Sequence, residues 1–399
     1  MSSRQKLLDS IEHILLLKGG LDVIDNPDAR CSKKMRTLIF SLRNIFPRDL
    51  FRGALYEFED TICQIEHAQI VAPCADIETR RNAIAKTLAF HAPMVLKPSI
   101  EKIEADKSYD LFLAICGHPR DLLYVNAAPH LRNACTTKIC MIDEVWVKQI
   151  EPHAYFLDVL KKFDLVVLYC SGTVKALSER IGVKCVFVPP GIDTLAFCPF
   201  PKNPPRVVDV SSVGRRSPTT HSALLEMVKE RDIFYVYDSI SGTQSINLRE
   251  HRKLLANLIR RSRYYIVNPG AMDNPRVRGD QHEMGPRYIE GAAAGTILIG
   301  EPPVNEVFNN IFNWPDAVVR LPYGSDQIAS VIDELDRQPE RQEEIRRRNV
   351  SESLMKHDWA YRWETILTTV GQEPAPELTR RKEHLQSIAV VLQSSEIAV

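Results

Sequence analysis

The sequence lacks any long hydrophobic run. Its longest apolar segments, residues 111–116 and 165–170, are much shorter than the ~20 residues of a membrane-spanning helix, so we expect no such span. The first twenty residues, MSSRQKLLDSIEHILLLKGG, contain an apolar patch that Asp9, Glu12 and His13 interrupt, and no small-residue cleavage site follows. We therefore predict a helical extension in residues 1–36 and no secretory signal.

The sequence also lacks paired cysteines and net charge. None of its nine cysteines forms a C-x-x-C pair, which is typical of reduced thiols and excludes the usual structural zinc motif. The 51 Lys and Arg residues balance 51 Asp and Glu residues, so no overall field attracts nucleic acid or an anionic bilayer. These absences predict a cytoplasmic protein that holds any anion through local contacts.

What the sequence contains is the composition of a globular protein, with 399 residues, 44% hydrophobic and 26% charged. Short aliphatic runs alternate with segments of helical periodicity, and this rhythm appears twice, which predicts two doubly wound α/β domains with parallel sheets. The predicted strands of the first half are 37–42, 69–72, 110–116, 138–142, 164–169 and 184–188. Those of the second half are 207–213, 233–237, 263–267, 296–299 and 317–321.

The segment 199–205 contains four prolines and separates the two halves as a linker. We predict a domain in residues 1–198, a second in 206–356, and a C-terminal helix with a peripheral tail in 357–399. Two such domains that face one another leave a cleft at the carboxyl ends of both sheets, where ligands bind in this fold class. The helical segments that we predict between the strands are 151–162, 171–181, 222–230, 249–259, 286–294 and 326–335, with a mainly helical stretch at 340–367.

The stretch 264–303 is the most informative for function. A strand ends at Asn268, a polar loop follows, and Gly285-Pro286 opens a helix whose free N–H groups and positive dipole end favour a phosphate near Arg287. Glu290, further along this helix, is a candidate acceptor for hydroxyl groups. The alternative is that the run GAAAG marks only a tightly packed helix.

A second stretch, 207–225, places Gly214, Arg215 and Arg216 after a strand and before a helix. A guanidinium at that position can donate two parallel hydrogen bonds to diphosphate oxygens. The alternative is a pair of solvated surface arginines.

The third stretch, KCVFVPPGIDTLAFCPF at 184–200, resembles the element that closes the first domain of nucleotide-sugar glycosyltransferases with the GT-B fold. Gly214-Arg215 resembles the Gly-Arg that starts their donor domain, and Glu290 resembles the second glutamate of their E-x₇-E signature. HDWAYRWETI at 357–366 is similar to the helix that ends such chains. The resemblance covers residues 184–370 and is of the retaining, group 1 type.

The chain departs from this family at two positions. The lysine that follows the arginine by five residues is replaced, since Thr220 or His221 stands there, and His221 is the candidate substitute. The first glutamate of the signature falls on His282, with Glu283 one residue later, so Glu283 is the candidate catalytic residue near the transferred sugar.

The first domain of such enzymes receives the acceptor. Polar residues follow two of its predicted strands: His118 in ICGHPRD, and Asp143 with Glu144 in MIDEVW. Any of them is a candidate base or orienting group for an acceptor hydroxyl. The alternatives are a turn residue bonded to the backbone for His118 and a helix N-cap for Asp143.

The resemblance implies a metal-independent glycosyltransferase that needs no cofactor. The donor is a nucleotide-diphospho-sugar, and the acceptor is a glycan, a lipid-linked molecule or a small molecule, in glycan or polysaccharide biosynthesis. Weak peripheral membrane contact through residues 15–17 and the nearby basic residues Arg30, Lys33, Lys34 and Arg36 is a further expectation. The alternatives are an inactive module that binds nucleotides or glycans, and a nucleotide-sugar epimerase on the same fold; no element matches the lysine that a glycogen-type phosphorylase needs.

Overall fold

The computed structural model describes residues 35–74, 98–103, 108–238 and 244–394. The predicted N-terminal extension, apart from Met35 and Arg36, lies outside the described residues, as does most of the predicted membrane contact. None of the described helices is long and apolar enough to cross a membrane.

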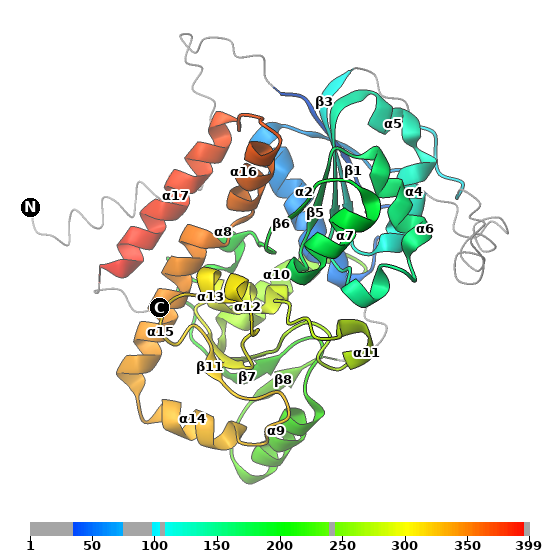
Figure 1. The fold of residues 1–399 in the computed structure, drawn as a ribbon. Coiled ribbons are helices and arrows are strands. Elements are labelled where there is room, and N and C mark those ends of the chain that lie inside the picture. Colours follow the sequence, from blue (N-terminus) through cyan, green and yellow to red (C-terminus); the bar gives the residue numbers. More distant parts are fainter. Residues whose placement is uncertain (1–34, 75–97, 104–107, 239–243, 395–399) are drawn as a thin grey trace, which may run out of the picture. The chain divides into compact units, whose positions relative to one another are not determined.

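The first lobe, residues 35–198, is built on a six-stranded sheet in the order β2-β1-β3-β4-β5-β6 (Figure 1). All of its pairs are parallel, as predicted. Its strands are β1 (Thr37–Phe40), β2 (Gln69–Val71), β3 (Tyr109–Cys116), β4 (Cys135–Ile142), β5 (Leu165–Leu168) and β6 (Cys185–Phe187).

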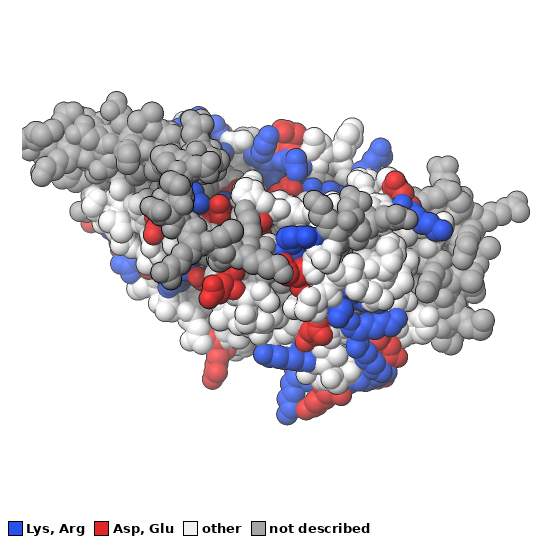
Figure 2. All heavy atoms as spheres, turned by 90° about the horizontal axis from the view of Figure 1, so that it is seen from above, with Lys and Arg blue, Asp and Glu red and all other residues white. Residues whose placement is uncertain are grey.

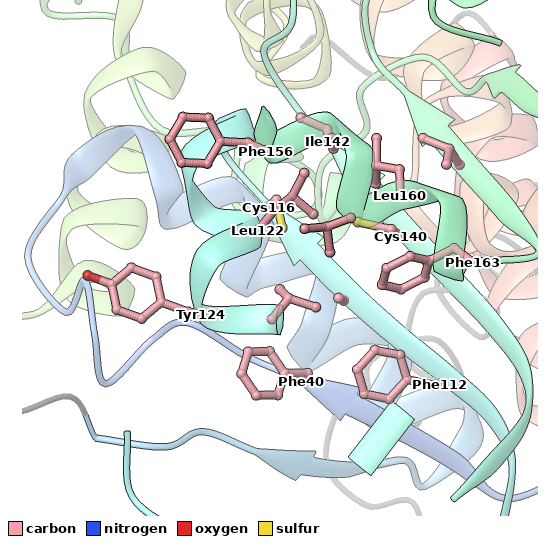
Figure 3. Close-up of a cluster of buried hydrophobic side chains, with 14 of the residues drawn as sticks. Phe40, Phe112, Cys116, Leu122, Tyr124, Cys140, Ile142, Phe156, Leu160 and Phe163 are labelled. Atoms are coloured by element: carbon pink, nitrogen blue, oxygen red, sulfur yellow. The ribbon is translucent and has the colours of Figure 1, made fainter. Parts of the chain in front are cut away.

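The central strands of this sheet are buried on both faces, which explains why they are almost continuously apolar. One face packs on a cluster that includes Phe40, Phe112, Cys140 and Phe163 (Figure 3), under the helices of residues 119–181. These are η2 (Pro119–Asp121), α4 (Leu122–Ala127), α5 (Pro129–Asn133), η3 (Val147–Gln149), α6 (Ala154–Leu157), η4 (Asp158–Lys162), η5 (Ser171–Thr173) and α7 (Val174–Ile181). The other face packs on α2 (Gly53–Glu66), which follows η1 (Leu50–Arg52), and on two C-terminal helices.

Our prediction of one continuous helix over 151–162 is wrong. A turn leads into the short α6, and the chain then continues as the 3₁₀ helix η4. In a 3₁₀ helix residues three apart lie on one face, so this conformation buries Phe156 with Val159 and Leu157 with Leu160. Packing of these four side chains decides the local conformation.

The second lobe, residues 206–356, has a five-stranded sheet in the order β11-β10-β9-β7-β8, again with parallel pairs. Its strands are β7 (Val208–Ser212), β8 (Tyr235–Tyr237), β9 (Ser262–Val267), β10 (Ile297–Gly300) and β11 (Val319–Arg320). Its helices are α9 (Pro218–Glu230), α10 (Leu248–Arg260), α11 (Pro275–Arg278), α12 (Pro286–Ala293), α13 (Glu306–Ile311), α14 (Ile328–Asp336) and α15 (Pro339–Lys356). The short α8 (Thr194–Phe197) precedes the linker.

The small-residue run on α12 packs closely against the sheet. A Cβ atom at Gly291 would clash with Leu298 of β10 and would lie 2.7 Å from Cδ1 of Tyr265 on β9. The helix therefore is tightly packed, and this packing fixes its N-terminus at the carboxyl edge of the sheet.

The C-terminal tail is not peripheral, contrary to our prediction. Helices α16 (Trp359–Thr369) and α17 (Pro376–Gln393) lie beside α2 (Figure 1). Trp359, Trp363 and Leu378 belong to the core between α2 and the first sheet. The segment after α15 thus completes the first lobe, which leaves little of its apolar surface to water.

Charged side chains of both signs are interspersed over the described surface in Figure 2, in keeping with the zero formal charge of the chain. An anion must therefore be bound by local groups.

Candidate active site

The carboxyl ends of the two sheets meet. Glu144, which follows β4, has an oxygen 3.8 Å from a terminal nitrogen of Arg215, which follows β7. Asp273, in the loop after β9, is also 3.8 Å from the Arg215 guanidinium. These distances are longer than hydrogen bonds, and half of the Arg215 side chain is exposed, so its donors are available to a ligand.

The turn after β7 gives its two arginines different roles. Gly214 has a φ of +86°, and its N–H donates to Asp238 at 2.9 Å, which holds the turn closed. Arg216 is buried, donates to the Asp238 carboxylate at 2.7 Å and lies over the ring of Tyr237. Arg216 therefore supports the turn, whereas Arg215 points away from these contacts.

The start of α12 faces the same turn. Its N-cap residue Gly285 makes no side-chain cap, and a Cβ atom there would meet nothing within 4 Å. A Cβ atom at Gly214 would lie 3.6 Å from Nε of Arg287, the second residue of α12. The structure thus places Arg287 beside Gly214, the residue that precedes Arg215, and a diphosphate site at this point stays a prediction.

The carboxylate of Glu290 lies deeper in this site than we expected. Its side chain is fully buried, with one oxygen bonded to Arg252 of α10 and the other to Arg287. Although burial by itself raises the pKa of Glu290, the two guanidinium groups outweigh it and lower the pKa below its ordinary value. Glu290 is thus an ionised partner of two arginines here, and its direct binding of donor hydroxyls stays a prediction.

Glu283 makes contacts that join the two lobes. One oxygen accepts from the N–H and the hydroxyl of Ser171 at 2.9 and 3.0 Å. The other accepts from the N–H of Gly172 at 2.8 Å and from Gln281 at 3.0 Å. Each oxygen already accepts two hydrogen bonds, and three of these four come from the start of η5, so the catalytic role of Glu283 stays a prediction that these contacts do not favour.

The two histidines near the family's motif positions also have partners within the second lobe. Nε2 of His282 is 3.0 Å from the guanidinium of Arg278. Nδ1 of His221 is 2.9 Å from the hydroxyl of Tyr235, and burial together with nearby Arg216 lowers the pKa of His221. This shift disfavours the charged form of His221, and its role as substitute for the missing lysine stays a prediction.

In the first lobe, His118 begins the 3₁₀ helix η2. Its Nδ1 accepts from the N–H of Arg120 at 3.3 Å, which is the turn contact that we considered as its alternative role. Burial and the ring of His153, 4.8 Å away, lower the pKa of His118 to about 4. His118 is therefore neutral at pH 7, when its ring can accept a proton but only as a weak base.

Asp143 does not start a helix, so its alternative role as an N-cap is wrong. β4 ends at Ile142, and the next helix begins only at Val147. Burial, with the like charge of Glu144, raises the pKa of Asp143 to about 7. No described residue donates a hydrogen bond to its carboxylate, so it is the group whose pKa best suits proton transfer near neutral pH.

Three further residues of the site could not be identified from the sequence. Arg252 and Glu57 join Glu290 in a buried ion-pair network, and the hydroxyl of Tyr265 is buried beside them without a hydrogen-bond partner among the described residues. Arg252 is one of many charged residues on α10, and only the tertiary contacts distinguish it.

The described residues contain no group of His, Cys, Asp or Glu that could hold a metal ion. The cationic side chains in and behind the candidate site are Arg215, Arg252 and Arg287.

Comparison with known proteins places this geometry in a known class. A family model described as glycosyl transferase-like matches residues 222–368. The chain is similar in structure to the Anabaena protein HepE in complex with UDP and glucose, with 11% identity, a TM-score of 0.51, and coverage of 84% of this chain and 99% of that one.

Two further solved structures share the fold. An alpha-glucosyltransferase in complex with UDP-glucose and DNA is 10% identical, with a TM-score of 0.52 and coverage of 85% of this chain and 100% of that one. A UDP-forming trehalose-phosphate synthase from Burkholderia xenovorans is 11% identical, with a TM-score of 0.50 and coverage of 87% and 99%. No curated protein sequence matches the chain. Residues 222–368 thus match the glycosyl transferase-like family, and the described part of the chain has the GT-B fold of these solved glycosyltransferases.

Proposed function

We propose that the protein transfers a sugar from a nucleotide-diphospho-sugar, bound by the second lobe, to an acceptor on the first lobe. The observation that carries this proposal is that Arg287, at the uncapped start of α12, lies beside Gly214, which precedes the half-exposed Arg215. Two guanidinium groups and free amide N–H groups suit a diphosphate. UDP and UDP-glucose appear in the names of the similar structures, which supports a uridine nucleotide.

The same groups stabilise the reaction as it proceeds. As the glycosidic bond to the diphosphate breaks, negative charge develops on the phosphate oxygens, and fixed cationic donors lower the energy of that state. Arg215 and Arg287 supply such donors, so the transfer needs no divalent ion or other cofactor in this proposal.

The acceptor hydroxyl lies near Asp143 and Glu144 in this arrangement, because Glu144 is the first-lobe residue closest to Arg215 in its ion pairs. Asp143, with its pKa of about 7, orients or deprotonates that hydroxyl. His118 lies just after the carboxyl end of the neighbouring strand, β3. The acceptor is a glycan, a lipid-linked molecule or a small molecule, and a role in polysaccharide or glycoconjugate biosynthesis is part of the proposal.

The cytoplasm is the proposed location. The eight described cysteines are all free thiols, which suits a reducing compartment.

The test is release of UDP or GDP from a panel of sugar nucleotides, with and without a chelator. We expect turnover with at least one UDP-sugar and no loss in the chelator. Arg215→Ala lowers kcat/KM by about ten- to a hundredfold, because a charge-assisted hydrogen bond is lost.

The matched control is Arg231→Ala, which removes a surface arginine of the same lobe that pairs with Asp333. It leaves kcat/KM unchanged. Absence of both nucleotide binding and turnover in the wild-type protein contradicts the proposal, and binding without any turnover or hydrolysis makes the chain a nucleotide-binding module instead.

A further inference from the structure

Four charged side chains of alternating sign run through the interior from the first lobe to the proposed donor site. Glu57 of α2 accepts from Arg252 of α10, with Nε–Oε2 at 2.9 Å and Nη2–Oε1 at 3.2 Å. Arg252 also donates to Glu290, which in turn accepts from Arg287. The series begins on α2 and ends beside Gly214.

Burial makes each member of this series depend on its neighbours. The side chain of Glu290 is fully buried, and those of Arg252 and Glu57 are 10% and 14% exposed. An ionised group in such surroundings is tolerated only when it is paired and hydrogen-bonded. Removing one charge therefore leaves its neighbour with fewer partners, and we expect the disturbance to pass along the series.

Glu57 is itself held in place by groups of its own lobe and of the C-terminal helix α16. Its carboxylate accepts from the N–H of Asp193 at 2.8 Å and from the indole N–H of Trp359 at 3.0 Å. The position of Arg252 is thus set by residues that belong to the core around the first sheet.

The last member, Arg287, has its donors divided between the interior and the site. One terminal nitrogen bonds Glu290, while a Cβ atom at Gly214 would lie 3.6 Å from Nε and 3.7 Å from the other terminal nitrogen. Because a guanidinium is planar, the bond to Glu290 sets the direction of the remaining N–H groups. The side chain is 31% exposed, so these groups are open to a ligand.

Two buried polar atoms near this guanidinium have no hydrogen-bond partner in the part of the chain that the structure describes. They are the hydroxyl of Tyr265 and Nδ1 of His251. Both residues are close enough to Arg287 to interact with it electrostatically. Both atoms could bond a polar group of a ligand bound at Arg287.

We propose that Glu57 and Arg252 are positioning residues for donor binding: they hold Glu290, and Glu290 directs Arg287 toward the diphosphate. This inference rests on the proposed function, and it assigns Glu290 a different task from direct binding of the donor's hydroxyl groups. It also makes donor affinity in the second lobe depend on a carboxylate of the first lobe.

The experiment is a double-mutant cycle on UDP affinity, measured by calorimetry, with wild type, Glu57→Gln, Arg287→Ala and the double variant. Arg287→Ala weakens UDP binding about ten- to a hundredfold. Glu57→Gln weakens it about three- to tenfold in the wild-type background, and by much less when Arg287 is absent, because coupled residues are not additive. A merely structural role of Glu57 lowers affinity equally in both backgrounds.

Arg252→Lys provides a second route if Glu57→Gln does not fold. It keeps the charge but cannot bond Glu57 and Glu290 with one planar group, so it reproduces the effect of Glu57→Gln. The control is Glu250→Gln, which removes an exposed carboxylate of α10 that pairs with Lys253 and leaves UDP affinity unchanged.

The outcomes separate this inference from the proposed function. Equal effects of Glu57→Gln in both backgrounds, or no effect of either Glu57→Gln or Arg252→Lys, overturn the positioning role and leave the donor site intact. No UDP binding by the wild type in this assay, together with no binding of other nucleotide diphosphates, overturns both.

Discussion

The carboxyl group of Asp143 lies in surroundings that oppose its ionisation. Burial and the charges of Glu144 and Asp121 raise its pKa from 3.8 to about 7, and Arg52 opposes this only in part. Tyr169 and Cys170 lie close to the same carboxyl group. A folded-state pKa above the unfolded one means that the native protein is most stable when Asp143 is protonated, and that this stability is lost as the pH rises from about 4 to about 7.

Asp143→Asn therefore stabilises the protein at alkaline pH while it lowers transfer. We expect a free energy of unfolding higher than that of wild type by about 1–3 kcal/mol at pH 8, with no difference near pH 4. Urea unfolding at both pH values measures it. Asp326→Asn, at an exposed position, serves as the control. An unchanged free energy of unfolding at pH 8 contradicts the assigned pKa.

We expect replacement of the two neighbouring arginines of the β7–α9 turn to affect the free energy of unfolding differently. Arg216→Ala removes the buried guanidinium that bonds Asp238, and this lowers the free energy of unfolding by about 1–3 kcal/mol. Arg215→Ala leaves stability nearly unchanged, because half of that side chain is exposed and its ion pairs are long. Thermal unfolding of both variants without ligand decides this; a larger destabilisation by Arg215→Ala contradicts it.

Among the elements, α12 approaches the sheet closely because Gly291 has no side chain. Gly291→Ala places a Cβ atom against Leu298 and Tyr265, so we expect a loss of about 1–3 kcal/mol from overpacking. Gly324→Ala is the matched control, since a Cβ atom there meets nothing within 4 Å. Urea unfolding measures both. Equal stability of the two variants shows that α12 shifts without cost.

The strands and most helices could be predicted because each is a local pattern. The run YDLFLAIC marks β3, and the Gly-Pro pair at 285–286 marks the start of α12. The partners of Glu290 could not be predicted, since Arg252 is 38 residues away along the chain. Glu57 is a further 195 residues from Arg252, and no periodicity links such positions. The buried α17 was missed because its apolar residues give only a weak helical pattern between prolines and charges.

At the scale of the whole chain, the two sheets are joined by polar contacts rather than by one apolar core. Glu57 and Asp60 of α2 pair with Arg252 and Arg249 of α10. Gln281 accepts from the N–H of Val147 at 2.8 Å. Such contacts can break and form again at lower cost than an apolar interface, which suits an enzyme that must admit two substrates.

Glu283 gives this arrangement its sharpest test. If its carboxylate anchors η5, Glu283→Gln weakens the bonds to the N–H groups of Ser171 and Gly172. Exchange of these two amide hydrogens then becomes about tenfold faster or more, because an acceptor for two backbone donors is impaired. Affinity for UDP stays unchanged, since no contact joins Glu283 to Arg215 or Arg287 among the described residues.

A catalytic Glu283 gives a different result: kcat falls by about a hundredfold or more while amide exchange at residues 171–172 stays as in wild type. Glu306→Gln, at an exposed acidic position on α13, controls for the loss of one negative charge in the same lobe. Hydrogen exchange and kcat measured on the same two variants therefore decide whether the carboxylate next to the family's signature position holds the lobes together or acts on the sugar.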